Sequence, residues 1–224
     1  MQKLLLIALL GLVAAPAGAA EPAKAPGSAQ EKARMREILG QPPRIAPRTD
    51  LTAAERAIAA PPKGFEDAGA VPTLWAILLH NPDLARTYIP MAGQFMVAGK
   101  LAPRDREIAI LRNAWLMQSP FIWGEHVPLS KKNVGLSDAD VQAIMAGSPS
   151  AHWNPHERAV LRAVEELHDG AMVSDATWTE LAKDMTEAQL VELPIFVGQY
   201  KVLAYYQNAL RIELRPGNDG LAAR

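Results

Sequence analysis

Two titratable residues, Glu107 and His126, stand on faces that are otherwise apolar. Glu107 shares a helical face with Leu111 and Ala114, at i, i+4 and i+7, and His126 has apolar residues four before and three after it. A buried carboxyl group either has a polar partner or takes up a proton more readily. If the two helices are antiparallel neighbours, Glu107 and His126 can meet, and such a pair is suited to acid–base chemistry.

Two predicted helices carry these residues. The first follows Pro103, which is suited to a first helical position, and runs to about Met117. Its apolar residues cover most of its circumference, which indicates a buried helix. The second begins at Ser119-Pro120, an N-cap followed by proline, and Gly135 is a suitable stop.

The rest of the chain also reads as helical. Helix-start motifs recur along it, at Ser28, Thr52, Asn81, Ser137, Asn154, Ser174 and Thr186. No stretch shows sustained period-two alternation with turn chemistry, so we predict an all-α fold. On the predicted helix 82–99, a stripe at helical spacing is expected to be a core face; it consists of Leu84, Tyr88, Met91 and Phe95.

Residues 1–20 are predicted to be a cleaved signal peptide. Lys3 precedes an apolar run of 4–15, too short for a membrane span, and an A-x-A motif follows, so we expect cleavage after Ala19 or Ala20. An uncleaved anchor is the alternative. The mature protein is then periplasmic or secreted, with no membrane attachment.

Composition divides the remainder into three parts. Residues 21–70 are an Ala/Pro-rich arm with short helices, 71–215 the helical domain, and 216–224 a C-terminal tail. The arm is either a floppy leader or packs on the domain or another subunit. A formal net charge of −1 and the lack of a basic run argue against nucleic acid and membrane partners.

The central motifs resemble the carboxymuconolactone decarboxylase family, which includes the alkylhydroperoxidase D-like proteins. They are Arg-Glu-x-x-Ile-Leu-Arg at 106–112, Trp-Gly-x-His-Val at 123–127 and Gly-Leu-Ser at 135–137. The resemblance is strongest over 101–137 and extends more weakly over 72–214. It implies an alkylhydroperoxidase D-like helical bundle around a central antiparallel helix pair, no cofactor or metal, and homo-oligomers, often trimers or hexamers.

The sequence departs from that family at two positions. A Cys-x-x-Cys of the alkylhydroperoxidase D-like branch falls on Ser119 and Ile122, and the chain has no cysteine, which excludes thiol peroxidase chemistry. In many decarboxylase-like members position 122 is glutamate. Glu125 is nearby, but we expect it to face solvent or a neighbouring subunit.

The resemblance implies cofactor-independent proton transfer or decarboxylation on a small carboxylated substrate, a lactone or keto acid. His126 would move the proton, Glu107 would orient the imidazole or relay the proton, and Trp123 would wall the pocket. Arg104, Arg106 or Arg112 would hold a substrate carboxylate, with Arg112 our choice. Ile122 and Ser119 are also expected at the site. The alternative is a non-catalytic periplasmic binding or scaffold protein that kept the fold.

Two further patterns are interpreted as structural. His152 and His156 have metal-like spacing, but Asn154-Pro155 breaks the helix between them. The sequence Glu165-x-x-His168 resembles half of a di-iron carboxylate site, which needs a second such motif. Neither pattern predicts a metal centre.

Overall fold

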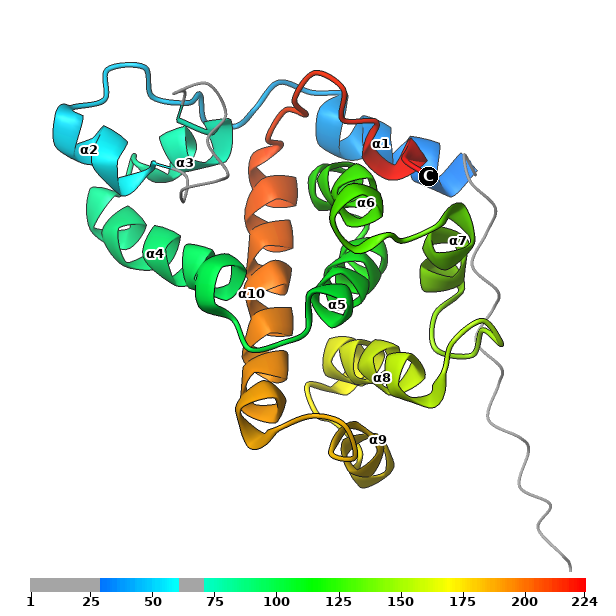
Figure 1. The fold of residues 1–224 in the computed structure, drawn as a ribbon. Coiled ribbons are helices and arrows are strands. Elements are labelled where there is room, and N and C mark those ends of the chain that lie inside the picture. Colours follow the sequence, from blue (N-terminus) through cyan, green and yellow to red (C-terminus); the bar gives the residue numbers. More distant parts are fainter. Residues whose placement is uncertain (1–28, 61–70) are drawn as a thin grey trace, which may run out of the picture.

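The computed structural model describes residues 29–60 and 71–224. The described part is helical, without strands (Figure 1). Its helices are α1 Ala29–Leu39, α2 Ala53–Ile58, α3 Thr73–Leu78, α4 Pro82–Ala98, α5 Pro103–Leu116, α6 Pro120–Val134, α7 Asp138–Ala146, α8 Pro155–Gly170, α9 Asp175–Leu181, α10 Glu187–Leu210 and the 3-10 helix η1 Gly220–Ala222. The all-α prediction is confirmed. The predicted signal peptide lies outside the described residues.

Helix α5 is the centre of the fold. It packs against α6, α8 and α10, and Figure 1 shows α6 beside it and the long α10 passing both. Residues 107–115 are all buried, as the apolar sequence predicts. The main hydrophobic core therefore surrounds the two helices that carry Glu107 and His126.

Local motifs place most helix ends correctly. Thr52, Ser137 and Thr186 each form the predicted capping box, and Asn81 accepts a hydrogen bond from the backbone of its own helix. Gly135 ends α6 in the left-handed conformation, with φ of 69°. Ser119 differs, because its side chain forms no capping hydrogen bond.

The described part of the N-terminal arm packs on the helical domain of its own chain. The Arg44 backbone N–H donates to the Leu210 carbonyl at 3.0 Å, and the Arg48 N–H donates to the Ala76 carbonyl at 3.2 Å. Leu51 is buried in a small apolar cluster with residues of α3 and α4. This segment thus covers part of the domain surface.

The residues after α10 also pack on the domain. Helix α10 ends at Leu210, where Arg211 adopts the left-handed conformation. The chain then crosses α6, and Leu221 of η1 is fully buried in the main core. The segment that we expected to be a tail is therefore part of the folded domain.

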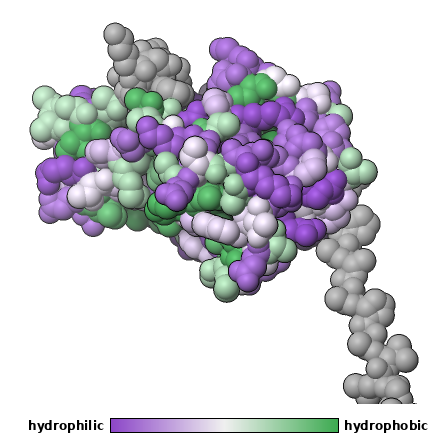
Figure 2. Space-filling view, turned by 60° about the horizontal axis from the view of Figure 1, so that its bottom comes forward, coloured by the Kyte–Doolittle hydropathy of each residue, from purple (hydrophilic) through white to green (hydrophobic). Residues whose placement is uncertain are grey.

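Exposed apolar side chains gather on α4 and α10. Our prediction that the whole α4 stripe is a core face is wrong, because Leu84 and Met91 are 47% and 46% exposed. Figure 2 shows hydrophobic residues in the left and central parts of the face that it presents, and hydrophilic ones on the right. On α10, four exposed apolar residues recur along one face, namely Val191, Ile195, Val202 and Tyr205. Within the described residues, no helix has the length and apolar character to cross a membrane.

Candidate functional site

Glu107 and His126 meet between α5 and α6. His126 Nδ1 lies 3.0 Å from Glu107 Oε2, and the two side chains are only 14% and 8% exposed. A carboxylate on Nδ1 fixes the orientation and the tautomer of an imidazole, so that Nε2 becomes the reactive nitrogen. No group of the described residues forms a hydrogen bond with His126 Nε2. The pair can therefore present one proton-transferring nitrogen to a ligand.

Tyr200 on α10 is a third member of this group, which the sequence analysis missed. Its ring packs edge-on against His126, with centroids 5.5 Å apart and an interplanar angle of 82°. Burial raises the pKa of the Tyr200 hydroxyl well above its usual value, and the Glu107 carboxylate acts in the same direction. Its hydroxyl partner is the weakly accepting sulfur of Met96, at 3.7 Å. Tyr200 is thus a neutral O–H donor beside His126.

A cavity of about 280 Å³ lies next to His126. This volume is close to the lower end of the range for small-molecule sites, about 300–1,000 Å³. Helix α6 contributes Phe121, Ile122, Glu125, His126 and Leu129; α10 contributes Tyr200, Leu203 and Gln207; and Pro72, Thr73, Leu74, Trp75, Ala92, Gly93, Met96 and Arg215 complete the wall. The wall is mainly apolar, with a few polar groups, as expected of a small-molecule site.

Glu125 faces this cavity, contrary to our expectation that it faces solvent or another subunit. It forms an ion pair with Arg215, whose Nε lies 3.1 Å from Glu125 Oε1, and Asn218 Nδ2 donates to the same oxygen at 2.8 Å. Burial opposes ionisation of Glu125, but the hydrogen bonds from Arg215 and Asn218 outweigh it, so its pKa lies below the usual value. Glu125 and Arg215 thus form a charged pair in the wall.

A larger and more open hollow of about 730 Å³ adjoins the cavity. Glu125 and Arg215 line both spaces, and Lys132 lies on the wall of the outer one. Two cationic side chains and one carboxylate therefore line the outer hollow, through which a ligand would reach the cavity. This balance favours the approach of an anion over that of a cation.

The other predicted site residues lie in different places. Ile122 lines the cavity. Trp123 is fully buried; its indole N–H donates to the Ala223 carbonyl at 3.0 Å, and its ring packs on Trp115. Ser119 is also fully buried, and its Oγ has no hydrogen-bond partner in the described chain. Neither residue lines the cavity.

Arg112 lies away from His126. Its Nε is 2.9 Å from Glu165 Oε1, and its Nη1 donates to the carbonyls of Ile144 and Met145. Burial lowers the pKa of Arg112, although Glu165 acts in the opposite direction. Arg112 thus joins α5 to α7 and α8, while the cation that lines the cavity is Arg215, which no local motif indicated.

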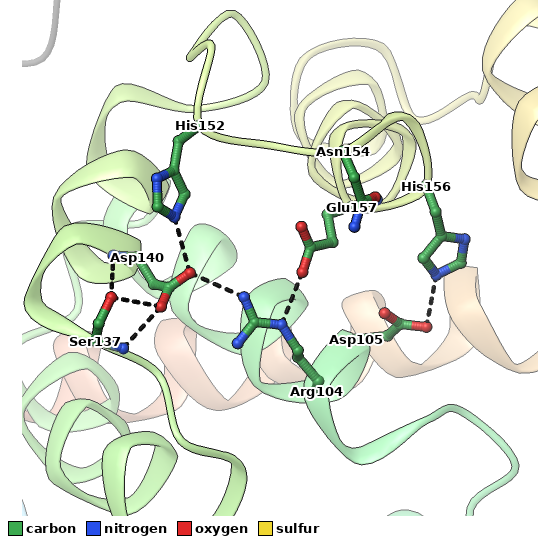
Figure 3. A network of polar contacts seen from close by, with 8 residues as sticks. All are labelled: Arg104, Asp105, Ser137, Asp140, His152, Asn154, His156 and Glu157. Carbon is green, nitrogen blue, oxygen red and sulfur yellow. Dashed lines mark hydrogen bonds and ion pairs between the residues drawn. The ribbon is translucent and has the colours of Figure 1, made fainter.

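Two histidines outside this site, His152 and His156, contact carboxylates. His152 Nε2 lies 2.9 Å from Asp140 Oδ1, and His156 Nε2 lies 2.9 Å from Asp105 Oδ2. Figure 3 shows Arg104 between Asp140 and a second carboxylate on α8. In residues 29–60 and 71–224, no group of three or more potential ligands is arranged to hold a metal ion. These contacts connect α5, α7 and α8.

Residues 82–166 match the model of the carboxymuconolactone decarboxylase family. This range contains α4, α5 and α6, and therefore both Glu107 and His126. No curated protein matches the sequence.

Solved structures share the fold at low sequence identity. An AhpD-type protein of unknown function from Agrobacterium tumefaciens is 17% identical, with a TM-score of 0.55 over 61% of this chain and 93% of that chain. A peroxidase-related AhpD core protein from Ralstonia eutropha is 16% identical, with a TM-score of 0.57 over 68% and 84%. The debrominase Bmp8 is 15% identical, with a TM-score of 0.64 over 78% and 93%. Over residues 82–166 this cysteine-free chain is thus similar to the carboxymuconolactone decarboxylase family, and its all-α fold is AhpD-like.

Proposed function

We propose that the protein catalyses cofactor-independent proton transfer or decarboxylation on a small carboxylated substrate, a lactone acid or keto acid. The observation that carries this proposal is the Glu107–His126 hydrogen bond of 3.0 Å beside a largely apolar cavity. A histidine with one nitrogen fixed and the other open to a ligand is the usual arrangement of a general acid–base.

The proposed reaction begins with the substrate carboxylate beside Arg215, the cation of the cavity wall. Where the carboxyl group is β to a carbonyl or conjugated with one, loss of CO₂ breaks the carbon–carboxylate bond and leaves its electron pair delocalised into that carbonyl group. Protonated His126, whose imidazolium is stabilised by Glu107, then delivers the Nε2 proton to that carbon, and solvent afterwards reprotonates the neutral imidazole. For enolisation, neutral His126 instead removes the proton α to the carbonyl.

The apolar wall supports the same proposal. A charge that spreads over a conjugated system is less penalised by an apolar environment than a localised carboxylate is, so a dry cavity favours the loss of CO₂. The neutral Tyr200 hydroxyl can donate to the developing enolate oxygen beside His126. Ile122 adds to the apolar wall at the position where many relatives carry glutamate.

Two measurements test the activity. Release of CO₂ and exchange of the α proton in D₂O are followed by NMR for a panel of keto acids and lactone acids. His126→Gln should abolish turnover and keep the fold, whereas His80→Gln, outside the cavity, should have no effect. Unchanged turnover in His126→Gln would contradict the acid–base role.

The second candidate is a non-catalytic binding or scaffold protein. It is favoured by the absence of cysteine and by Ile122 in place of an acid. In that case the wild type binds acids in a thermal-shift screen but neither releases CO₂ nor exchanges protons. His126→Gln then loses stability, by roughly 1–3 kcal/mol for an unsatisfied buried partner.

We further propose that the protein forms homo-oligomers, trimers or hexamers, through the exposed apolar face of α10. Ile195 lies on this face, and Met172 is a similarly exposed apolar residue outside it. Light scattering after size exclusion should show that Ile195→Glu dissociates the oligomer and that Met172→Glu does not. A wild-type monomer would refute this part of the proposal.

We also propose export to the periplasm or medium with residues 1–20 removed. Fractionation of expressing cells and N-terminal sequencing test this, with the mature chain expected to begin at Ala20 or Glu21. A chain that starts at Met1 would contradict cleavage.

A further inference from the structure

The cavity wall contains a buried amide without a partner. Gln207 is only 4% exposed, and its Oε1 forms no hydrogen bond with any part of the described chain. By contrast, Gln199, on the same helix and equally buried, donates to the Tyr88 hydroxyl at 3.0 Å. An unpaired buried amide costs roughly 1–3 kcal/mol, so a group that completes it is strongly favoured.

Gln207 and His126 both line this cavity. Tyr200, which packs on His126, and Gln207 are seven residues apart on α10, which corresponds to about 10 Å along a helix axis. The cavity wall is mainly apolar, and Ala92 and Gly93, which α4 contributes to it, are small. A ligand that reaches both residues is therefore an elongated apolar group, such as a ring, with a polar atom at its far end.

The chemistry of an amide identifies that polar atom. A primary amide offers a donor and an acceptor side by side, and a hydroxyl group can pair with either of them. A wholly apolar ligand would leave the amide without a hydrogen bond. Binding sites that contain a buried polar group discriminate strongly against ligands that cannot pair with it. A solved neighbour of this fold, a variant of the debrominase Bmp8, holds a planar ring, 2,3,4-tribromopyrrole.

We propose that Gln207 determines specificity by binding a hydroxyl group at the far end of a ring-bearing keto acid, whose acidic carbon lies at His126. This inference rests on the proposed function and defines the substrate class of the same site. The ligand hydroxyl forms the missing hydrogen bond with the Gln207 amide, while the ligand carboxylate lies beside Arg215. Gln207 takes no part in the proton transfer.

The test uses two probes that differ by one hydroxyl group, 4-hydroxyphenylpyruvate and phenylpyruvate. Calorimetric titration of the wild-type protein should show at least about tenfold tighter binding of the hydroxylated probe. Gln207→Met, of similar size but without the amide, should reduce the ratio to near one by weakening that probe. Gln199→Met is the matched control and should keep the ratio, with folding of each variant checked by circular dichroism.

The outcomes separate this inference from the proposed function. The role of Gln207 would be overturned if the wild type bound both probes equally or bound neither. An unchanged affinity ratio in Gln207→Met would overturn it as well. Proton exchange at the benzylic carbon reports the activity separately, and His126→Gln should abolish exchange while it keeps the binding ratio. A preserved ratio without any exchange in the wild type would refute the catalytic proposal and leave Gln207 as the specificity residue.

Discussion

Substitution of Gly124 by alanine should disconnect the segment after α10 from α6. A methyl group at this position would overlap Asn218 Oδ1 and lie 2.7 Å from the backbone nitrogen of Gly220. Asn218 must therefore move, and the close approach of the two backbones is possible because position 124 has no side chain. Glycine is the residue that permits such an approach.

The expected cost follows from the hydrogen bonds of Asn218. Its Nδ2 donates to the Glu125 carboxylate at 2.8 Å and to the Phe121 carbonyl at 3.2 Å, and its Oδ1 accepts from the Gly220 N–H at 2.8 Å. A neutral hydrogen bond contributes about 1 kcal/mol and one to a charged group about 2 kcal/mol, so complete loss costs roughly 4 kcal/mol. For a chain of this size, this corresponds to a fall of the melting temperature by roughly 8–16 °C.

Thermal and urea denaturation measure this change. Gly170→Ala is the matched control, because a Cβ there has nothing within 4 Å, and it should stabilise by at most about 1 kcal/mol. Asn218→Ala should lose most of the same free energy, and the double variant should cost less than the sum of the two. If the free energy of unfolding of Gly124→Ala is within about 1 kcal/mol of the wild-type value, the packing of the segment after α10 against α6 does not stabilise the protein.

Three further predictions concern the buried polar contacts. The hydrogen bond to Asp105 raises the pKa of His156, although burial opposes it. Protonated His156 therefore stabilises the fold fully below pH 6.5, the usual histidine pKa, and this stabilisation is lost as the pH rises through the folded-state pKa. Melting temperatures from pH 5.5 to 9 should show this loss in the wild type but not in His156→Gln. Arg112→Met leaves Glu165 buried without its cation and should cost roughly 3 kcal/mol in urea unfolding; an unchanged midpoint would argue against a structural ion pair. Trp123→Phe removes the indole hydrogen bond to the segment after α10 and should cost about 1–3 kcal/mol, with a cavity ligand still bound; loss of binding without loss of stability would instead indicate a direct contact.

Local signals in the sequence predicted the helices well, because caps and helix stops act within a few residues. The Glu107–His126 pair was also predictable, since helical spacing puts both on the inner faces of consecutive helices. Periodicity shows which residues share a face but not what covers that face, so the exposure of Leu84 and Met91 on α4 could not be seen.

The rest of the site comes from distant segments. Tyr200, Gln207 and Arg215 lie long after His126 in the chain, and no motif near them indicates that they share a cavity with it. The choice of Arg112 followed its place on the helix of Glu107, but that side chain points towards α7 and α8. Local patterns therefore predicted the Glu107–His126 pair but not the other residues that line the cavity.

The segment that crosses α6 also sets the order in which the site is completed. A chain is synthesised from its N-terminus, at roughly 5–20 residues per second. Helices α5 and α6 are thus made well before Arg215 and Asn218. A growing chain can hold the Glu107–His126 pair while the wall beside Glu125 is still open. The wall beside Glu125 is therefore the last part of the cavity to be completed, once the segment after α10 has been made.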